Sequence, residues 1–346
     1  MEAIHDMIVS FYDKNFKGLQ NNASLVVDKS TYSLIKRPVE IDELKCNCEA
    51  YTENIQPTFL VVKDDVGNYI YGALAGVPLL NEKNITEISS TDLKTLLSSD
   101  VILEPSSYSY VYQYLNYIFA QWQSQVNQNS FSTELIYKTY TNTIQSIAMG
   151  DLFPSIEKQV YNAWDEMQAY LKFYGLFLET ELDLINKKVK FIVGKTMVNP
   201  MNIKLWEYGI RNYGKWVASI NECQGYYNNG SSWTAGYKWI LTSQNDITVT
   251  TSNRDIYPIK RKVFVSEESL QDANTQALTE LLANLYNENI EIQTTDITPD
   301  FETSFAVYVN KGDGKYKDLP CGELIYDSSG LNKCQIGYRF TGANFI

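Results

Sequence analysis

Three carboxylates recur at every second position in the segment LFLETELDL, residues 176–184. In a strand, this period places Glu179, Glu181 and Asp183 on one face and leucines on the other. Paired carboxylates can serve as the acid and base of a glycosidase, and clustered ones can bind a metal. A row of acids on the solvated face of a strand is the commoner arrangement, and no neighbour that would shift their pKa values can be identified. We therefore expect no catalytic and no metal-binding residues here.

Histidine, the usual partner of a catalytic nucleophile, occurs only once in 346 residues, as His5 in the first turn of the chain. Ser-His-Asp and Cys-His sites need a histidine beside the nucleophile, and common zinc sites need more ligands. The chain also lacks a P-loop, a GxSxG motif and a GxGxxG motif that opens a helix. We expect a protein that is not an enzyme and needs no cofactor. A carbohydrate hydrolase that works with paired acids and no histidine stays open as an alternative.

The loop Asp64-Asp65-Val66-Gly67-Asn68 also carries possible metal ligands. It lacks the regular alternation and the terminal glutamate of a calcium loop, and all its residues suit a hairpin turn. We predict a turn there.

Cysteine chemistry is limited as well. The chain has five cysteines, and Cys46 and Cys48 lie too close in sequence for an unstrained bridge. Free thiols are the expected state, although Cys321 and Cys334 could pair across a late hairpin.

Composition bounds the class of protein. Hydrophobic residues make up 44% and charged residues 20%, which is typical of a globular chain of two to four domains. The net charge of −12 argues against nucleic-acid binding, which needs clustered lysine and arginine. No apolar run is long enough to span a bilayer, and the acidic first residues do not suit a signal peptide. We expect folding in a cytoplasm.

The predicted secondary structure around these residues differs from one region of the chain to the next. Residues 1–105 show short strands at the spacing of a small barrel or sandwich. Residues 106–196 predict helices over 111–122 and 154–175, followed by a hairpin that contains the acidic row. Residues 197–265 predict a second barrel-like domain, and residues 266–346 a helix with terminal strands that complete that barrel. The predicted fold class is α+β and rich in β-structure.

The late part of the chain has a recognisable order of elements. In residues 237–265, YKWILTSQNDITVTTSNRDIYPIKRKVFV, alternating strands flank a hairpin turn at 243–246. A turn with an Arg-x-x-x-Pro pattern follows, from Arg254 to Pro258. Ser266 then caps a helix whose apolar residues recur at helical spacing, and residues 290–292 resume a strand.

This order of hairpin, strand, proline break, capped helix and returning strand resembles the C-terminal half of phage tail baseplate hub proteins, the tail-associated family of long-tailed phages. The resemblance implies two small β-barrel or sandwich domains per chain, joined by mixed helix and hairpin regions. It also implies a structural protein of the virion tail tip: a homotrimer that closes the tail tube and links host attachment to DNA ejection. The implied partners are the tail tube or distal tail protein and receptor-binding or fibre proteins.

On this hypothesis DNA passes through the ring without being bound, and some of the acidic excess repels phosphate. Glu179, Glu181 and Asp183 are the candidate residues for such a lumen-facing strand. Acidic residues that only keep the chain soluble are an equal alternative. A receptor-binding or glycan-binding tail module that uses exposed tyrosines and tryptophans is the main competing function.

Overall fold

The computed structural model places most of the chain. The residues that it does not describe are 1–6, 20–24, 52–55, 65, 81, 84, 105–107, 129–130, 139–143, 150–158, 175, 196, 205–208, 216–219, 243–246, 256, 284–287, 294–304, 311–315, 329 and 337–346. His5 therefore lies outside the described residues.

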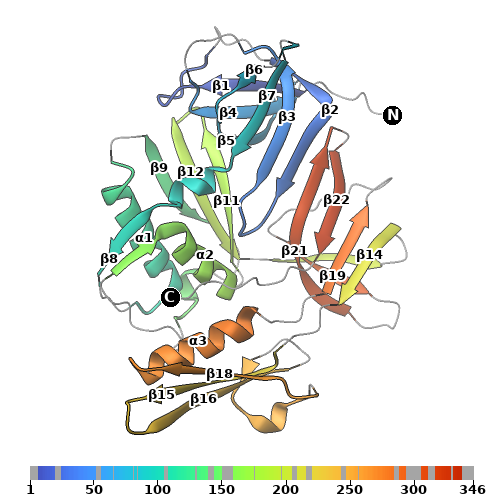
Figure 1. Ribbon diagram of the computed structural model, residues 1–346. Helices are drawn as coiled ribbons and strands as arrows, with labels where there is room; N and C mark the ends of the chain where they lie inside the picture. Colours follow the sequence, from blue (N-terminus) through green and yellow to red (C-terminus); the bar gives the residue numbers. More distant parts are fainter. Residues whose placement is uncertain are drawn as a thin grey trace.

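The N-terminal strands form a closed six-stranded barrel (Figure 1). Their order around the barrel is β1-β4-β5-β7-β3-β2, and the pairing of Ile8 with Val26 between β1 and β2 closes it. The short strand β6 pairs with β7 at the rim. The bounds are β1 Met7–Tyr12, β2 Leu25–Lys36, β3 Glu43–Glu49, β4 Phe59–Asp64, β5 Tyr69–Leu74, β6 Leu79–Leu80 and β7 Ile85–Thr91.

Strand β4 explains how this barrel joins the next part of the chain. Its residues Phe59, Leu60, Val61 and Val62 are all fully buried, although a strand with one solvated face would alternate. Leu60 and Val62 point into the core of the barrel, whereas Phe59 and Val61 belong to the core of the middle region. One strand thus contributes to two cores.

The middle region packs two helices against two small sheets beside the barrel (Figure 1). The predicted apolar face of α1 is confirmed, because Tyr114, Leu115, Ile118 and Trp122 are buried. The predicted hairpin is confirmed as β11 paired with β12, and β9 pairs with β12 in parallel. The bounds are η2 Leu93–Leu97, β8 Asp100–Leu103, α1 Val111–Gln125, β9 Ser132–Tyr137, η3 Ile144–Ser146, β10 Gln159–Asn162, α2 Ala163–Phe173, β11 Leu176–Asp183 and β12 Lys188–Lys195.

The prediction of a helix over 154–175 is wrong at residues 159–162. Residues Gln159–Asn162 form β10, which pairs with β8, and the helix begins at Ala163. The Asn162 side chain accepts hydrogen bonds from the backbone N–H groups of Trp164 and Asp165 at 3.1 and 3.2 Å, as an N-cap does. Pairing with β8 overrides the helical spacing of Val160. The proposed start at Pro154 lies outside the described residues.

The late strands extend the barrel sheet through β21. Strand β21 pairs with β2 at Leu34–Tyr326 and neighbouring positions, and the sheet continues in the order β22-β19-β14. Strand β20 also pairs with β21 and, in parallel, with β13. Figure 1 shows these strands beside β2. The bounds are β13 Met197–Lys204, β14 Gly209–Lys215, β19 Glu288–Gln293, β20 Phe305–Asn310, β21 Tyr316–Asp327 and β22 Gly330–Ile336.

Residues 222–283 form a separate sheet covered on one face by a helix, here called the α3 module (Figure 1). The predicted pairing of 237–241 with 247–248 is confirmed, whereas the turn at 243–246 lies outside the described residues. The Ser266 hydroxyl oxygen accepts the N–H of Glu268 at 3.1 Å, and the helix proper starts at Leu270. The bounds are β15 Glu222–Asn228, β16 Trp233–Leu241, β17 Ile247–Thr248, η5 Thr251–Asn253, β18 Arg261–Ser266 and α3 Leu270–Ala283.

The predicted fold class, α+β and rich in β-structure, is confirmed. The domain boundaries stay a prediction, and the pairings add two facts about them. Strands β13 and β14 pair with strands beyond residue 287, and α3 packs on the sheet that precedes it. Among the described residues, no helix has the length and apolar character to cross a bilayer.

The thiols of the first barrel are free. Cys46 and Cys48 are buried and unbridged, as predicted, and burial raises the pKa of each to about 12. In the late hairpin the backbone register places Cys321 opposite Ile336 and Cys334 opposite Leu324. The side chains of Cys321 and Cys334 lie outside the described residues, so their bridge stays a prediction.

Candidate functional site: a charged cleft beside the barrel

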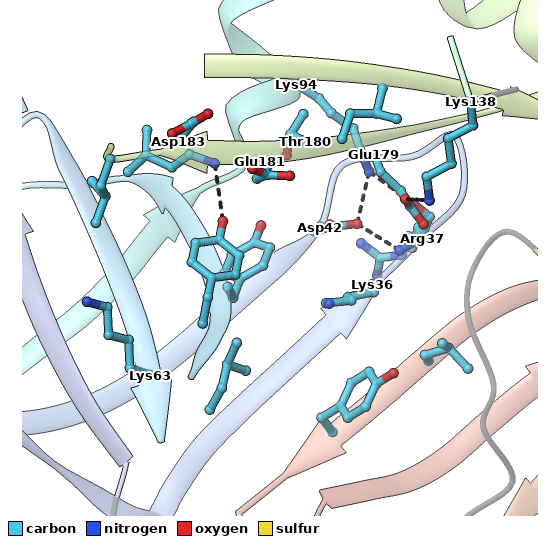
Figure 2. A pocket seen from close by; sticks show the side chains of 18 of the residues that line it. Lys36, Arg37, Asp42, Lys63, Lys94, Lys138, Glu179, Thr180, Glu181 and Asp183 are labelled. Carbon is cyan, nitrogen blue, oxygen red and sulfur yellow. Dashed lines mark hydrogen bonds and ion pairs between the residues drawn. The ribbon is translucent and has the colours of Figure 1, made fainter. Parts of the chain in front are cut away.

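A cleft of about 740 Å³ lies where the barrel, the β11–β12 hairpin and strand β21 meet. Its barrel side is formed by the ends of β2 and β4 and by Tyr69 and Tyr71 on β5. Its other sides are formed by the acidic row of β11 and by Leu324 and Tyr326 of β21. Figure 2 shows this arrangement, with charged side chains entering from both walls. The volume is in the range of small-ligand pockets.

The structure places the predicted acidic row in this cleft and pairs each acid with a lysine. Glu179 contacts the Lys138 amine at 2.6 Å, and Lys190 contacts Glu181 at 2.9 Å and Asp183 at 2.7 Å. The sequence analysis did not foresee these partners. Lys190 lies directly opposite Glu181 on β12, as cross-strand pairing allows. The row is therefore largely neutralised within the chain.

Asp183 is the most constrained member of the row. Its carboxylate accepts the side-chain and backbone N–H groups of Asn186, and these bonds, followed by Lys190, hold its pKa well below the usual range. Asp183 stays ionised at any ordinary pH, so it cannot act as a general acid. The row supplies no proton donor at this position.

Close approach of two strands fixes the position of the row against the barrel. A Cβ atom on Gly72 of β5 would lie 2.4 Å from the Tyr69 hydroxyl and 3.0 Å from Cβ of Leu182. The same hydroxyl accepts the N–H of Leu182 at 3.3 Å. A glycine at 72 therefore lets β11 approach the barrel wall closely enough for this contact.

Behind the cleft lies a buried ion cluster that the sequence analysis missed. The Lys94 amine is 1% exposed and lies 3.0 Å from Asp42 Oδ1 and 3.3 Å from Asp92 Oδ2. It also donates to the backbone carbonyls of Arg37 and Glu40 at 3.0 and 2.7 Å. A buried charge that is paired and fully hydrogen-bonded is tolerated, whereas an isolated one is not.

Burial and the attraction between opposite charges shift the pKa values of the cluster in opposite directions. Burial alone would lower the pKa of Lys94, but Asp42 and Asp92 outweigh it and raise that pKa. Burial raises the pKa of Asp42 to about 6, and Lys94 opposes the shift. Lys94 thus keeps its charge in the folded chain because both carboxylates lie beside it.

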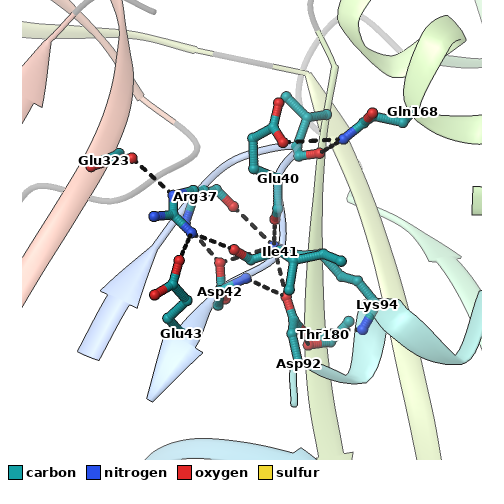
Figure 3. Close-up of polar contacts among 11 residues, drawn as sticks. Arg37, Glu40, Ile41, Asp42, Glu43, Asp92, Lys94, Gln168, Thr180 and Glu323 are labelled. Atoms are coloured by element: carbon teal, nitrogen blue, oxygen red, sulfur yellow. Dashed lines mark hydrogen bonds and ion pairs between the residues drawn. The ribbon is translucent and has the colours of Figure 1, made fainter. Parts of the chain in front are cut away.

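The segment 37–42, which connects β2 to β3, links this cluster to four other parts of the molecule. Figure 3 shows its contacts with Asp92, Gln168 and Glu323. Asp42 N–H donates to Asp92 before η2 at 2.8 Å, Gln168 of α2 donates to the Val39 carbonyl, and Leu178 N–H of β11 donates to the Pro38 carbonyl. Arg37 donates through Nε to Glu323 of β21 at 2.9 Å. We call this segment the connector.

No sequence signal could have found this cluster. Lys94 follows a capped turn, where a lysine normally points to solvent, and its burial depends on three segments distant in sequence. The role of Asp92 is partly local, because its carboxylate accepts the N–H of Lys94 at 3.0 Å and caps η2.

The other candidate ligand set is a turn. Asp64 accepts hydrogen bonds from the backbone and side chain of Asn68 at 2.6 and 2.7 Å, and Gly67 has φ of +90°. The turn interpretation is therefore confirmed. Among the described residues, no group of three or more potential metal ligands is found.

Most of the residues that carried the family resemblance lie in the α3 module, whereas the returning strand at 290–292 is β19 of the large sheet. Arg254 forms an ion pair with Glu222 of β15, and the Pro258 carbonyl accepts the Asn221 side chain at 2.9 Å. The peptide bond between Tyr257 and Pro258 is cis. This turn therefore fixes the path between β17 and β18.

Comparison with solved structures relates the whole fold to phage tails. The 43 kDa tail protein of prophage MuSo2 from Shewanella oneidensis matches with a TM-score of 0.55 at 12% identity, over 96% of this chain and 97% of that one. A chain of the Francisella PdpA-VgrG complex matches with a TM-score of 0.55 at 14% identity, over 96% of this chain and 57% of that one. A chain of the p2 virion baseplate in its activated conformation matches with a TM-score of 0.50 at 8% identity, over 96% of this chain and 98% of that one.

No family model and no curated protein matches the chain by sequence. The structural matches nevertheless cover nearly the whole chain and, for the tail and baseplate proteins, nearly the whole of the matched chain. The chain has the fold of phage tail and baseplate proteins, which confirms the resemblance expected from its sequence. At these identities the likeness concerns the fold.

Proposed function

We propose that the protein is a structural component of a phage tail tip, a homotrimeric baseplate hub that closes the end of the tail tube and links host attachment to DNA passage. One observation carries this proposal: the full-length match to tail and baseplate chains, in which 96% of this chain is aligned. A match that spans every region favours a shared architectural role over a shared local site.

The arrangement of the sheets supports a ring-forming role. The closed barrel continues through β2 and β21 into the late strands, so one sheet of thirteen strands connects the two ends of the chain. A sheet that joins N-terminal and C-terminal strands makes a stiff wall, and the connector ties it to the helices. Three such walls arranged head to tail would enclose a central opening.

The proposal assigns this chain no catalytic role. In the candidate site each acid of the row is paired with a lysine, and Asp183 is held ionised. The proposed partners are the tail tube or distal tail protein on one side and receptor-binding or fibre proteins on the other. The proposed location is the tail tip of the virion, after folding in the host cytoplasm.

The orientation of Glu179, Glu181 and Asp183 toward the lumen stays a prediction. The pairing with Lys138 and Lys190 reduces the charge that this row would present to DNA. Repulsion of phosphate by the ring would then depend on the net charge of −12 of the whole chain rather than on this strand.

Native mass spectrometry tests the trimer directly. We expect a species of three copies of the 39.6 kDa chain. A monomer at every concentration that can be reached would contradict the proposal.

A glycan-binding tail module is the second candidate, because the α3 module exposes large aromatic side chains. Trp233 is 61% exposed, Tyr237 59% and Tyr257 71%. Exposed aromatic rings can stack on sugar rings. Binding of the purified chain to host cell-wall polysaccharide, lost in Trp233→Ala, would support this function. Binding that Trp233→Ala leaves intact would contradict it.

A further inference from the structure

The cations on the two walls of the cleft differ in whether carboxylates of the chain pair with them. On the hairpin wall, Lys138 and Lys190 are each engaged by carboxylates of the acidic row. Behind the wall, Lys94 is enclosed by Asp42 and Asp92. Arg37, at the end of β2, contacts Glu43 and Glu323. These four cations are therefore satisfied within the chain.

Lys36 and Lys63 on the barrel wall are different. Both side chains line the cleft and are half-buried, and within the described part of the chain neither has a carboxylate at ion-pair distance. The Lys36 amine lies 5.8 Å from the centre of the Tyr326 ring. Figure 2 shows Lys36 and Lys63 on the side of the cleft opposite the acidic row. Among the described residues, these two amines therefore give the cleft a pair of cations that have no carboxylate partner.

The same cleft offers apolar contacts. Leu184 and Ile185 of the hairpin turn line it, and Ile185 is 91% exposed. Tyr326 of β21 lines it as well.

We propose that this cleft binds an acidic, partly apolar peptide segment of a partner protein. Carboxylates of the segment would contact the amines of Lys36 and Lys63, and its apolar side chains would cover Ile185. Nucleic acid fits less well, because two amines can neutralise only a few of its regularly spaced phosphates and the net charge of −12 of the chain repels the rest. A peptide can carry a few carboxylates at the positions of Lys36 and Lys63 and no other charge. This interaction does not depend on ring formation by the chain.

The test uses the full chain and a short fluorescent peptide of alternating glutamate and leucine, followed by fluorescence anisotropy. We expect saturable binding that weakens as salt is added. Lys36→Glu combined with Lys63→Glu should weaken binding about tenfold or more. Lys36→Gln combined with Lys63→Gln should weaken it less, because the repulsion is absent. Unchanged melting temperatures would show that both variants fold.

The matched control is Lys45→Glu, which makes the same charge change at an exposed position of the barrel outside the cleft. It should leave the affinity unchanged. Equal weakening by Lys45→Glu, equal binding of a glutamine-leucine peptide, or no binding at all would overturn the proposal. So would tighter binding of a single-stranded oligonucleotide that the double variant abolishes. If the double variant changes the oligomeric mass, the occupant is a second copy of the chain and the assignment to a partner protein is wrong.

Discussion

The connector and the α3 module join secondary-structure elements by opposite means. At the connector, elements meet through buried charges, with Lys94 between Asp42 and Asp92 and Arg37 against Glu323. In the α3 module, glycines in the sheet allow the helix to pack closely against it. A Cβ atom on Gly225 would lie 2.5 Å from the backbone of Ala273, and one on Gly236 would lie 2.0 Å from the Asn274 side chain.

The two kinds of contact should differ in how strongly they restrict the relative position of the joined elements. A buried charge needs its partner beside it, so we expect the cluster to favour one arrangement of its segments. A glycine contact only allows two surfaces to approach closely. The buried core of the α3 module is also small, with six buried residues in its described cluster compared with twenty-eight in that of the middle region. We expect the connector to fix the relative position of distant parts and the α3 module to unfold first.

Removal of the central cation should have the largest effect. Lys94→Met leaves Asp42 and Asp92 buried without their counter-charge, which costs about 3–5 kcal/mol of unfolding free energy. Denaturant unfolding measures this value. Lys188→Met is the matched control, because its carboxylate partner Glu134, at 2.8 Å, is 44% exposed and water can replace the lysine there. Equal losses in the two variants would show that the buried cluster contributes nothing special.

Glu166 is a buried carboxylate that has no cation at ion-pair distance among the described residues. Glu166 of α2 accepts the Tyr114 hydroxyl at 2.6 Å, and burial raises its pKa to about 7 from an ordinary value of 4.5. Because the folded state binds this proton more tightly, the contribution of Glu166 to stability is fully present below pH 4.5 and is lost as the pH rises to about 7. Glu166→Gln should remove this loss, which amounts to roughly 3 kcal/mol at most.

Unfolding free energies at pH 5 and pH 8 measure the change in Glu166→Gln. The variant should differ from the wild type mainly at pH 8, where the wild-type carboxylate is ionised. A difference that is the same at both pH values would mean that ionisation of Glu166 has no part in it.

The glycine contact of the α3 module should give a smaller loss confined to that region. Gly225→Ala places a methyl group against the backbone of α3, and such overpacking costs about 1–3 kcal/mol. Hydrogen exchange should speed up in residues 222–283 and stay unchanged in the barrel. Thr234→Ala, at an exposed position of β16, is the control. Faster exchange in the barrel as well would show that the two regions do not unfold independently.

The contact between the connector and β21 should give the smallest effect. Glu323→Gln removes a partly exposed partner of Arg37, and such pairs contribute about 1 kcal/mol or less. Exchange of the amides in β21 should increase slightly, with α3 as the internal reference. A loss as large as that of Lys94→Met would mean that this ion pair, rather than the buried cluster, holds the joint.

Local sequence patterns predicted most helices and strands correctly. They gave no information on features that depend on contacts between residues distant in sequence. The barrel strands, the apolar face of α1 and the pairing of β11 with β12 follow from periodicity that each segment carries itself. The strand at Gln159–Asn162 was missed because its partner β8 lies far away in sequence. The buried cluster was missed for the same reason, since lysine and aspartate show no local sign of burial.

The acidic row illustrates both outcomes at once. Its strand was predicted correctly, whereas its lysine partners and the cleft around it depend on Lys138, Lys190 and the barrel wall. The sequence showed three acids on one face, and the folded chain shows how they are neutralised.

Electron microscopy of the purified protein tests the proposed ring. We expect closed ring-shaped particles of three copies around a central opening, unchanged in the cleft variant Lys36→Glu with Lys63→Glu. Single globular particles at all concentrations, or open chains that never close, would contradict a structural hub.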